Sequence, residues 1–190
     1  MNRSYYGLSS ALFPEPSPAD WEESRRAGFQ AVELSISSHG SCGCPEDCIE
    51  IGGRISAGIQ EAGLLLWTVH IPYGPQWDPS AADQAEHREN CGRIRAVLEE
   101  SARWGAKGAV LHGSYEPVPL EEAQREIRLE RARESVAFLA EEAEKMGLFL
   151  AVEDLPRSCL GNCSGELQEV LGNSGASVCF DVNHLLLESH

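Results

Sequence analysis

Histidines and carboxylates follow short apolar runs at several places in this sequence. His70 comes after LLLWTV, His112 after GAVL, Glu153 after LFLAV, and Asp181 after SVCF, with His184 three residues further on. Oxygen and nitrogen donors of this mixture suit Mn²⁺, Mg²⁺, Co²⁺ or Zn²⁺ and require no thiolate. Asp181 and His184 can converge on one cation if the chain turns between them. The pattern predicts metal-assisted chemistry on a small polyhydroxylated molecule.

Each of these histidines also has a purely structural interpretation. His70 alone could be a core histidine satisfied by one hydrogen bond, and His184 could cap a helix or support a ligand. His112 repeats the placement of His70 one unit later in the sequence. Two histidines that end neighbouring strands point to one mouth of a barrel, which favours a functional role for both.

Glu153 is the strongest single position, because a carboxylate behind so apolar a stretch needs a cation, a metal or a hydrogen-bond donor to offset the cost of burial. The structural alternative is an ion pair with Arg157 or Lys107. Asp154 points the opposite way along a strand and is expected to serve packing or a loop. Glu33 is a lesser candidate that could simply face solvent.

The elements that carry these residues recur as one unit: a charged segment of helical period, a glycine, a short apolar run and a polar residue. Glycine past a helix end adopts the left-handed backbone that caps the last turn. Apolar runs without alternation are typical of parallel strands buried on both faces. The five units carry their glycines at Gly28, Gly63, Gly105, Gly147 and Gly175, and they end at Glu33, His70, His112, Glu153 and Asp181.

A first strand is expected near Tyr5 to Ser10, with a helix from about Pro18, which brings the total to six βα units. The longest expected helix runs from about Leu120 to Met146. We expect its apolar stripe to contain Ile127, Leu129, Ala132, Val136, Leu139 and Ala143.

Successive parallel strands form either a barrel or an open doubly wound sheet. Polar residues end five separate strands, whereas an open sheet concentrates its site at one switch point, and no GxGxxG or GxxxxGK[ST] motif is present. The expectation is an α/β fold of the (β/α)₈ TIM-barrel type in a single domain spanning residues 1–190. Because such a barrel needs eight strands and typically about 250 residues, we expect the chain to be a truncated fragment that lacks strands 7 and 8.

The charge and hydrophobicity of the sequence restrict the classes of partner that the protein is expected to bind. The formal charge of −15 comes from 30 acidic and 15 basic residues, which disfavours nucleic acid. The basic residues between Arg125 and Arg133 alternate with Glu and are expected on a solvated helix face. No apolar stretch reaches the roughly 20 residues of a membrane span, and no signal segment is visible, so we expect a cytoplasmic protein without membrane contact. The sequence leaves a homo-oligomer open.

Seven cysteines occur without the paired spacing of a disulfide framework. Most are expected to be reduced thiols. The segment CGCPEDC could hold zinc, but it lacks a second pair at finger spacing. An ordinary loop is favoured there.

His70 within HIPY, His112, Glu153 within VEDLPRSCLGN, and CFDVNH together resemble the xylose isomerase-like TIM-barrel superfamily of sugar phosphate isomerases and epimerases, which also includes endonuclease IV. The resemblance runs from Tyr6 to His190. It implies that Glu153 and Asp181 are metal ligands and that Glu153 is also catalytic, trading a proton with the carbon next to a carbonyl. It further implies that His70 and His184 orient the oxygens of a carbohydrate substrate. His112 is a further expected substrate-binding residue, and His184 is also expected to bind the metal with Glu153 and Asp181.

The family pattern also includes a His on strand seven and a second Glu on strand eight, and neither has a counterpart in this sequence. Weak or no activity is therefore expected of this chain. Two other functions stay open. In an endonuclease IV-like phosphodiesterase, all five positions would bind zinc, although the acidic charge disfavours a polyanionic substrate. In a non-catalytic sugar-binding barrel, the pocket would persist without turnover.

Overall fold

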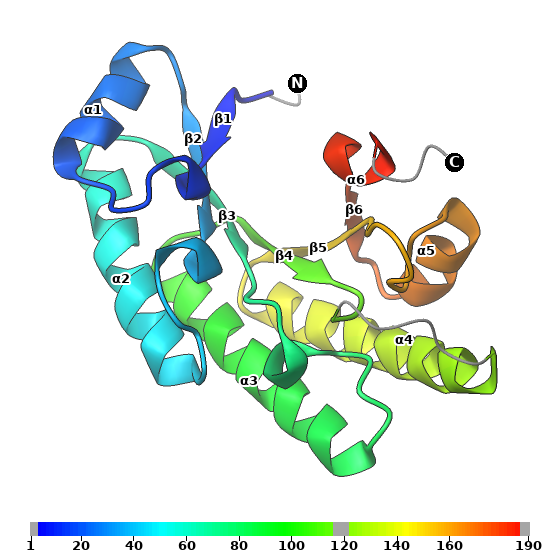
Figure 1. Cartoon of the computed structure of the whole chain (residues 1–190). Coiled ribbons are helices and arrows are strands. Elements are labelled where there is room, and N and C mark those ends of the chain that lie inside the picture. The colour runs from blue at the N-terminus through cyan, green and yellow to red at the C-terminus, as the bar shows by residue number, and fades with distance from the viewer. Residues whose placement is uncertain (1–3, 116–121, 187–190) are drawn as a thin grey trace.

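The computed structural model describes residues 4–115 and 122–186. Its centre is a curved sheet of six parallel strands in the order β1-β2-β3-β4-β5-β6 (Figure 1). The order never reverses, as it would in a doubly wound sheet, so the predicted barrel type is confirmed. The strands are β1 (Gly7–Ser9), β2 (Ala31–Ser35), β3 (Leu65–His70), β4 (Gly108–His112), β5 (Phe149–Glu153) and β6 (Ser177–Cys179).

Helices follow the strands and pack against one another in chain order, from α1 to α5. Figure 1 shows α1 to α4 along one side of the curved sheet. None of the helices in the described ranges is long and apolar enough to cross a membrane. The helices are α1 (Pro18–Arg26), α2 (Pro45–Glu61), α3 (Gln84–Arg103), α4 (Glu122–Lys145), α5 (Ser164–Leu171) and α6 (Val182–Leu186), and the 3₁₀ turns are η1 (Ser10–Leu12), η2 (Ile36–His39) and η3 (Pro75–Trp77).

Helix ends carry the predicted signals, with one exception. Pro18 begins α1, and Ser17 and Asp20 form a capping box in which the Ser17 N–H donates to Asp20 Oδ2 at 2.8 Å. The expected helix-capping glycines have positive φ values, but Gly175 is not a cap. Helix α5 ends at Leu171, and Gly172, with φ of 50°, takes that position. Gly175 instead turns the chain into β6.

The core lies between the sheet and its helices, where Leu34, Ile59 and Leu98 are fully buried. The prediction that every strand is buried on both faces is wrong for β6, where Val178 is 48% exposed. Val178 is in register with Val152 of the buried core, so it lies on the helix-covered face of the sheet. Among the described residues, β6 is an edge strand and Val178 does not belong to that core.

Helix α4 corrects two expectations. Ile127 is 50% exposed, because a helix turns about 100° per residue and places it roughly 140° from Ala132 on the buried stripe. Arg125 and Arg128, expected on a solvated face, lie close to that stripe instead. Arg128 donates to Asp78 and to Ser80 in the loop after β3. The Arg128–Asp78 ion pair attaches the loop after β3, at the carboxyl edge of the sheet, to α4.

Candidate functional site

Strand register brings the predicted residues to the same edge of the sheet. His112 ends β4 directly beside Glu153, which ends β5, and His70 ends β3. Asp181 follows β6 by two residues, and His184 lies one turn into the chain beyond it, in α6. All five therefore meet at the carboxyl ends of parallel strands, where ligand sites of such folds form.

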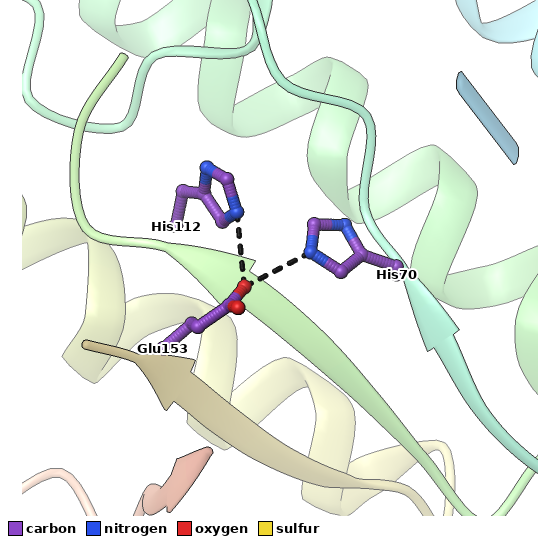
Figure 2. Close-up of side chains that lie close together, drawn as sticks. All are labelled: His70, His112 and Glu153. Carbon is purple, nitrogen blue, oxygen red and sulfur yellow. Dashed lines mark hydrogen bonds and ion pairs between the residues drawn. The ribbon is translucent and has the colours of Figure 1, made fainter. Parts of the chain in front are cut away.

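Glu153 is the centre of this cluster, and it is 6% exposed. Figure 2 shows His70 and His112 pointing at its carboxylate from the two preceding strands, with each Nε2 lying 3.0 Å from Oε2. Burial opposes ionisation of Glu153, but the hydrogen bonds from His112 and His70 outweigh it and hold the pKa well below its usual range. The predicted alternative of an ion pair with Lys107 is wrong, because Lys107 precedes β4 at the opposite end of the sheet.

The two histidines that hold Glu153 differ in the direction in which their surroundings shift the pKa. The Nδ1 of His70 lies 2.9 Å from the carbonyl oxygen of Ile71, so both ring nitrogens of His70 face acceptors and both can donate. Burial lowers the pKa of His70, but the hydrogen bond and charge of Glu153 and the charge of Glu33 outweigh it, and the net pKa is raised. Burial lowers the pKa of His112. The two opposite pKa shifts favour a proton on His70 over a second proton on His112.

On the other side of Glu153, the backbone orients Asp181 and His184. The Nδ1–H of His184 donates to the Asp154 carbonyl at 2.6 Å, which leaves Nε2 as the ring nitrogen with a free lone pair. This Nε2 lies 3.7 Å from Asp181 Oδ2. The Asp154 side chain accepts the Asp181 N–H at 2.6 Å through Oδ1, so Asp154 has the loop-holding role expected for it.

Two groups in the described residues have the arrangement of potential metal ligands. His70, His112 and Glu153 form one, and Glu153, Asp181 and His184 form the other, with the ligand atoms of each group lying within 4.8 Å of one another. Glu153 belongs to both groups. A carboxylate has two oxygens, so one side chain can serve two neighbouring positions.

These residues line a pocket of about 580 Å³ that opens at the carboxyl edge. Glu33 lines it too and accepts a hydrogen bond from Thr68 Oγ1 at 3.2 Å. The expectation that Glu33 could simply face solvent is wrong, because its strand points it into the sheet's inner side. Burial raises the pKa of the Glu33 carboxyl against the opposing effects of the His70 charge and the Thr68 hydroxyl.

Sequence reasoning missed two aromatic residues of the pocket. Tyr73 stacks on His112, with ring centroids 5.2 Å apart and planes at 16°, and Tyr115 lies at the same mouth. Each tyrosine comes three residues after a strand-ending histidine, in HIPY and HGSY. That repeated spacing was the available signal. A tyrosine face beside polar groups is suited to cover the apolar side of a sugar ring.

Comparison with known proteins agrees with this fold. A search of curated protein sequences finds no match. Among solved structures, the chain resembles a D-tagatose 3-epimerase-like protein (TM-score 0.76, 19% identity) and D-psicose 3-epimerase from Clostridium cellulolyticum H10 (TM-score 0.74, 19% identity), covering 96% and 98% of this chain. It also resembles 3-keto-D-glucoside 4-epimerase from E. coli (TM-score 0.73, 19% identity, 98% of this chain).

The chain spans 66% of the length of the first two of these structures and 72% of the third. The family described as xylose isomerase-like TIM barrel matches residues 21–190, which is most of the sequence. Because this match covers far more than half of the sequence, the chain belongs to the xylose isomerase-like TIM barrel family.

Proposed function

We propose that this chain forms the metal-binding and substrate-binding part of a divalent-metal-dependent isomerase or epimerase acting on a sugar or sugar phosphate by proton transfer next to a carbonyl. The observation that carries the proposal is the placement of Glu153. It is a buried, ionised carboxylate at the junction of two potential ligand groups, on the wall of a pocket large enough for a monosaccharide. The epimerase names of the similar structures are consistent with this chemistry.

Glu153, Asp181 and His184 fit a divalent cation such as Mn²⁺, Mg²⁺, Co²⁺ or Zn²⁺. Two carboxylates and an imidazole are the donor types these ions accept. The imidazole of His184 is also oriented for metal binding, because the Asp154 carbonyl accepts its Nδ1–H and Nε2 is directed toward Asp181. A bound cation supplies polarisation of the substrate carbonyl and stabilises the negative charge that develops when the neighbouring carbon loses a proton.

The chain's own residues then have distinct roles. Glu153 accepts the proton from the carbon next to the carbonyl, which is a general-base step. The N–H groups that keep Glu153 ionised also weaken it as a base. When His70 or His112 turns its N–H to a substrate oxygen, the pKa of Glu153 rises and its carboxylate becomes a stronger base. His184, held by Asp154, presents Nε2 to the cation beside Asp181.

Solvent exchange tests this function. The protein is incubated in D₂O with Mn²⁺ and with each of a panel of ketoses that includes D-fructose, and deuterium at the carbon next to the carbonyl is measured by mass spectrometry. We expect slow incorporation that requires the metal and is absent in Glu153→Gln. A matched control, Glu141→Gln, alters an exposed acid on α4 and should exchange like the parent. Absence of exchange with every ketose in the presence of Mn²⁺ would contradict the proposal.

A second candidate is a zinc phosphodiesterase of the endonuclease IV kind. It is favoured by one observation, the presence of two potential ligand groups that share Glu153. The formal charge of −15 opposes it, since the site would have to approach a polyanion. Metal analysis separates the candidates: one ion supports the isomerase, about three zinc ions support the phosphodiesterase, and none supports a sugar-binding barrel without turnover.

A further inference from the structure

The loop between β5 and α5 places an arginine at the wall of the pocket. Among the described residues that line the pocket, Arg157 is the only lysine or arginine, and it is exposed. The carboxylates on the same wall are those of Glu33, Glu153 and Asp181. An anionic group that enters the pocket is therefore repelled by these carboxylates and attracted by Arg157.

The backbone at Arg157 has a conformation that favours glycine. Its φ is 57°, and no other non-glycine residue in the described ranges has a positive φ. The Cys159 N–H donates to the Pro156 carbonyl at 3.3 Å, so Arg157 is the first central residue of a tight turn. Glycine is the usual residue at a positive φ in such turns. Arginine is strained there, and strained residues of this kind cluster at functional sites.

Contacts from two helices hold this turn in place. Arg125 of α4 donates to the carbonyl oxygens of Ser158 at 2.8 Å and Cys159 at 3.1 Å. Arg125 also pairs with Glu166 of α5, at 2.7 Å from Nε to Oε1 and 2.8 Å from Nη2 to Oε2. Glu166 in turn accepts the Gly161 N–H at 2.7 Å. These contacts fix the point of the loop from which the Arg157 side chain extends.

The chemistry of a guanidinium group indicates which anion it would take. Its planar N–H groups can donate two parallel hydrogen bonds to two oxygens of one phosphate. A phosphate ester carries nearly two negative charges at neutral pH, whereas a sugar hydroxyl carries none. The formal charge of −15 repels anions from the protein as a whole, so phosphate binding requires a local cation. Arg157 is that cation at the pocket.

We propose that Arg157 is a specificity-determining residue that binds the phosphate group of a phosphorylated ketose, so that the pocket takes a sugar phosphate in preference to a neutral sugar. The carbonyl end of the sugar then lies toward Glu153 and Asp181, and its phosphate lies at the loop after β5. The identity of the sugar as a ketose rests on the proposed function. Binding of the phosphate itself does not depend on turnover.

Calorimetric titration with D-fructose 6-phosphate and with D-fructose tests this preference. Each sugar is titrated into the full chain in Mg²⁺ and, separately, in EDTA, because only the titration in EDTA excludes binding of phosphate to a metal ion. In EDTA we expect the phosphorylated sugar to bind about 10-fold more tightly than D-fructose, as a charge-assisted hydrogen bond at an exposed side chain would provide. Inorganic phosphate should compete with the phosphorylated sugar.

Three variants assign the preference to the side chain. Arg157→Gly removes the guanidinium and suits a φ of 57°, so the loop should keep its shape and the protein its stability. It should lose the preference for the phosphorylated sugar, with its affinity for D-fructose unchanged. Arg157→Lys keeps the charge without the paired donors and should retain part of the preference. Arg26→Ala, in the last turn of α1 with its side chain 69% exposed, is the control and should bind like the parent.

Equal affinity of the parent for the two sugars in EDTA would overturn the proposal. A preference that persists in Arg157→Gly, or one that is lost equally in Arg26→Ala, would overturn it as well. The outcome is separable from that of the deuterium exchange described above. Exchange with D-fructose but no preference that depends on Arg157 contradicts this proposal alone, whereas such a preference without exchange on any ketose contradicts the proposed function alone.

Discussion

Replacing Glu153 by glutamine removes one negative charge from the pocket and leaves the shape of the side chain nearly unchanged. In the parent protein, this carboxylate accepts hydrogen bonds from His70 and His112, each at 3.0 Å. The side chains of Glu153 and His70 are 8% and 14% exposed, so solvent screens them little. We expect Glu153→Gln to destabilise the metal-free protein, because the glutamine oxygen accepts the same bonds without the charge.

The expected loss is about 2 kcal/mol at pH 5.5. A hydrogen bond to a charged group contributes about 1.5–3 kcal/mol and a neutral one about 0.5–1.5 kcal/mol, a difference of roughly 1 kcal/mol for each of the two bonds. Because the pKa of Glu153 is lowered in the folded protein, its ionised carboxylate contributes to stability above pH ~4.5, and this contribution is lost as pH falls. Because the pKa of His70 is raised in the folded protein, its protonated form contributes to stability below pH ~6.5, and this contribution is lost as pH rises. Both contributions are fully present between these limits and are lost progressively outside them.

Urea unfolding in EDTA at pH 5.5 and pH 9 measures this difference. The loss caused by Glu153→Gln should be smaller at pH 9, because the contribution of protonated His70 is lost as pH rises. Glu33→Gln is the matched control in the same pocket. Burial raises the pKa of Glu33, so its contribution fails as pH rises, and its replacement should leave stability unchanged or higher at pH 9. Equal stability of Glu153→Gln and parent at pH 5.5, or an equal loss at both pH values, would refute the reasoning.

Two further substitutions test how the site is supported. Asp154→Ala removes the side-chain oxygen that accepts the Asp181 N–H, so we expect Mn²⁺ affinity to fall about 10-fold to 100-fold in calorimetric titrations, and unchanged affinity would count against a role in orienting the loop. Arg125→Ala leaves the partly buried Glu166 unpaired, so thermal or urea unfolding should show a loss of about 3 kcal/mol. Arg133→Ala, whose side chain is 56% exposed, should change stability by less than about 0.5 kcal/mol, and similar losses in both variants would contradict this account.

The order of the strands and the polar residues at their ends could be predicted from the sequence, because both depend on local patterns. Glycines such as Gly63 and Gly105 mark helix ends within a few residues of an apolar run. Parallel strands then place their last residues at one edge, so His112 and Glu153 meet without further information. Ile127 was also predictable, since its angle along α4 excludes it from the buried stripe.

Contacts between distant segments could not be predicted. Arg128 pairs with Asp78, 50 residues earlier in the chain, and nothing near either residue indicates this. Glu33 is held in the pocket by a hydrogen bond from Thr68, which depends on a register shift between β2 and β3. The sequence pattern at Glu33 is equally compatible with an exposed strand end. Such features need the register of the sheet as well as its strands.

Metal binding by the purified chain tests the central claim most directly. The protein is stripped with EDTA and dialysed against Mn²⁺ or Zn²⁺, and the bound metal is counted by mass spectrometry for the parent, Asp181→Ala and the exposed-site control Glu141→Gln. The account predicts one divalent ion per chain in the parent and the control and its loss in Asp181→Ala. No bound ion, or an ion retained by Asp181→Ala, would contradict a metal centre at Glu153, Asp181 and His184.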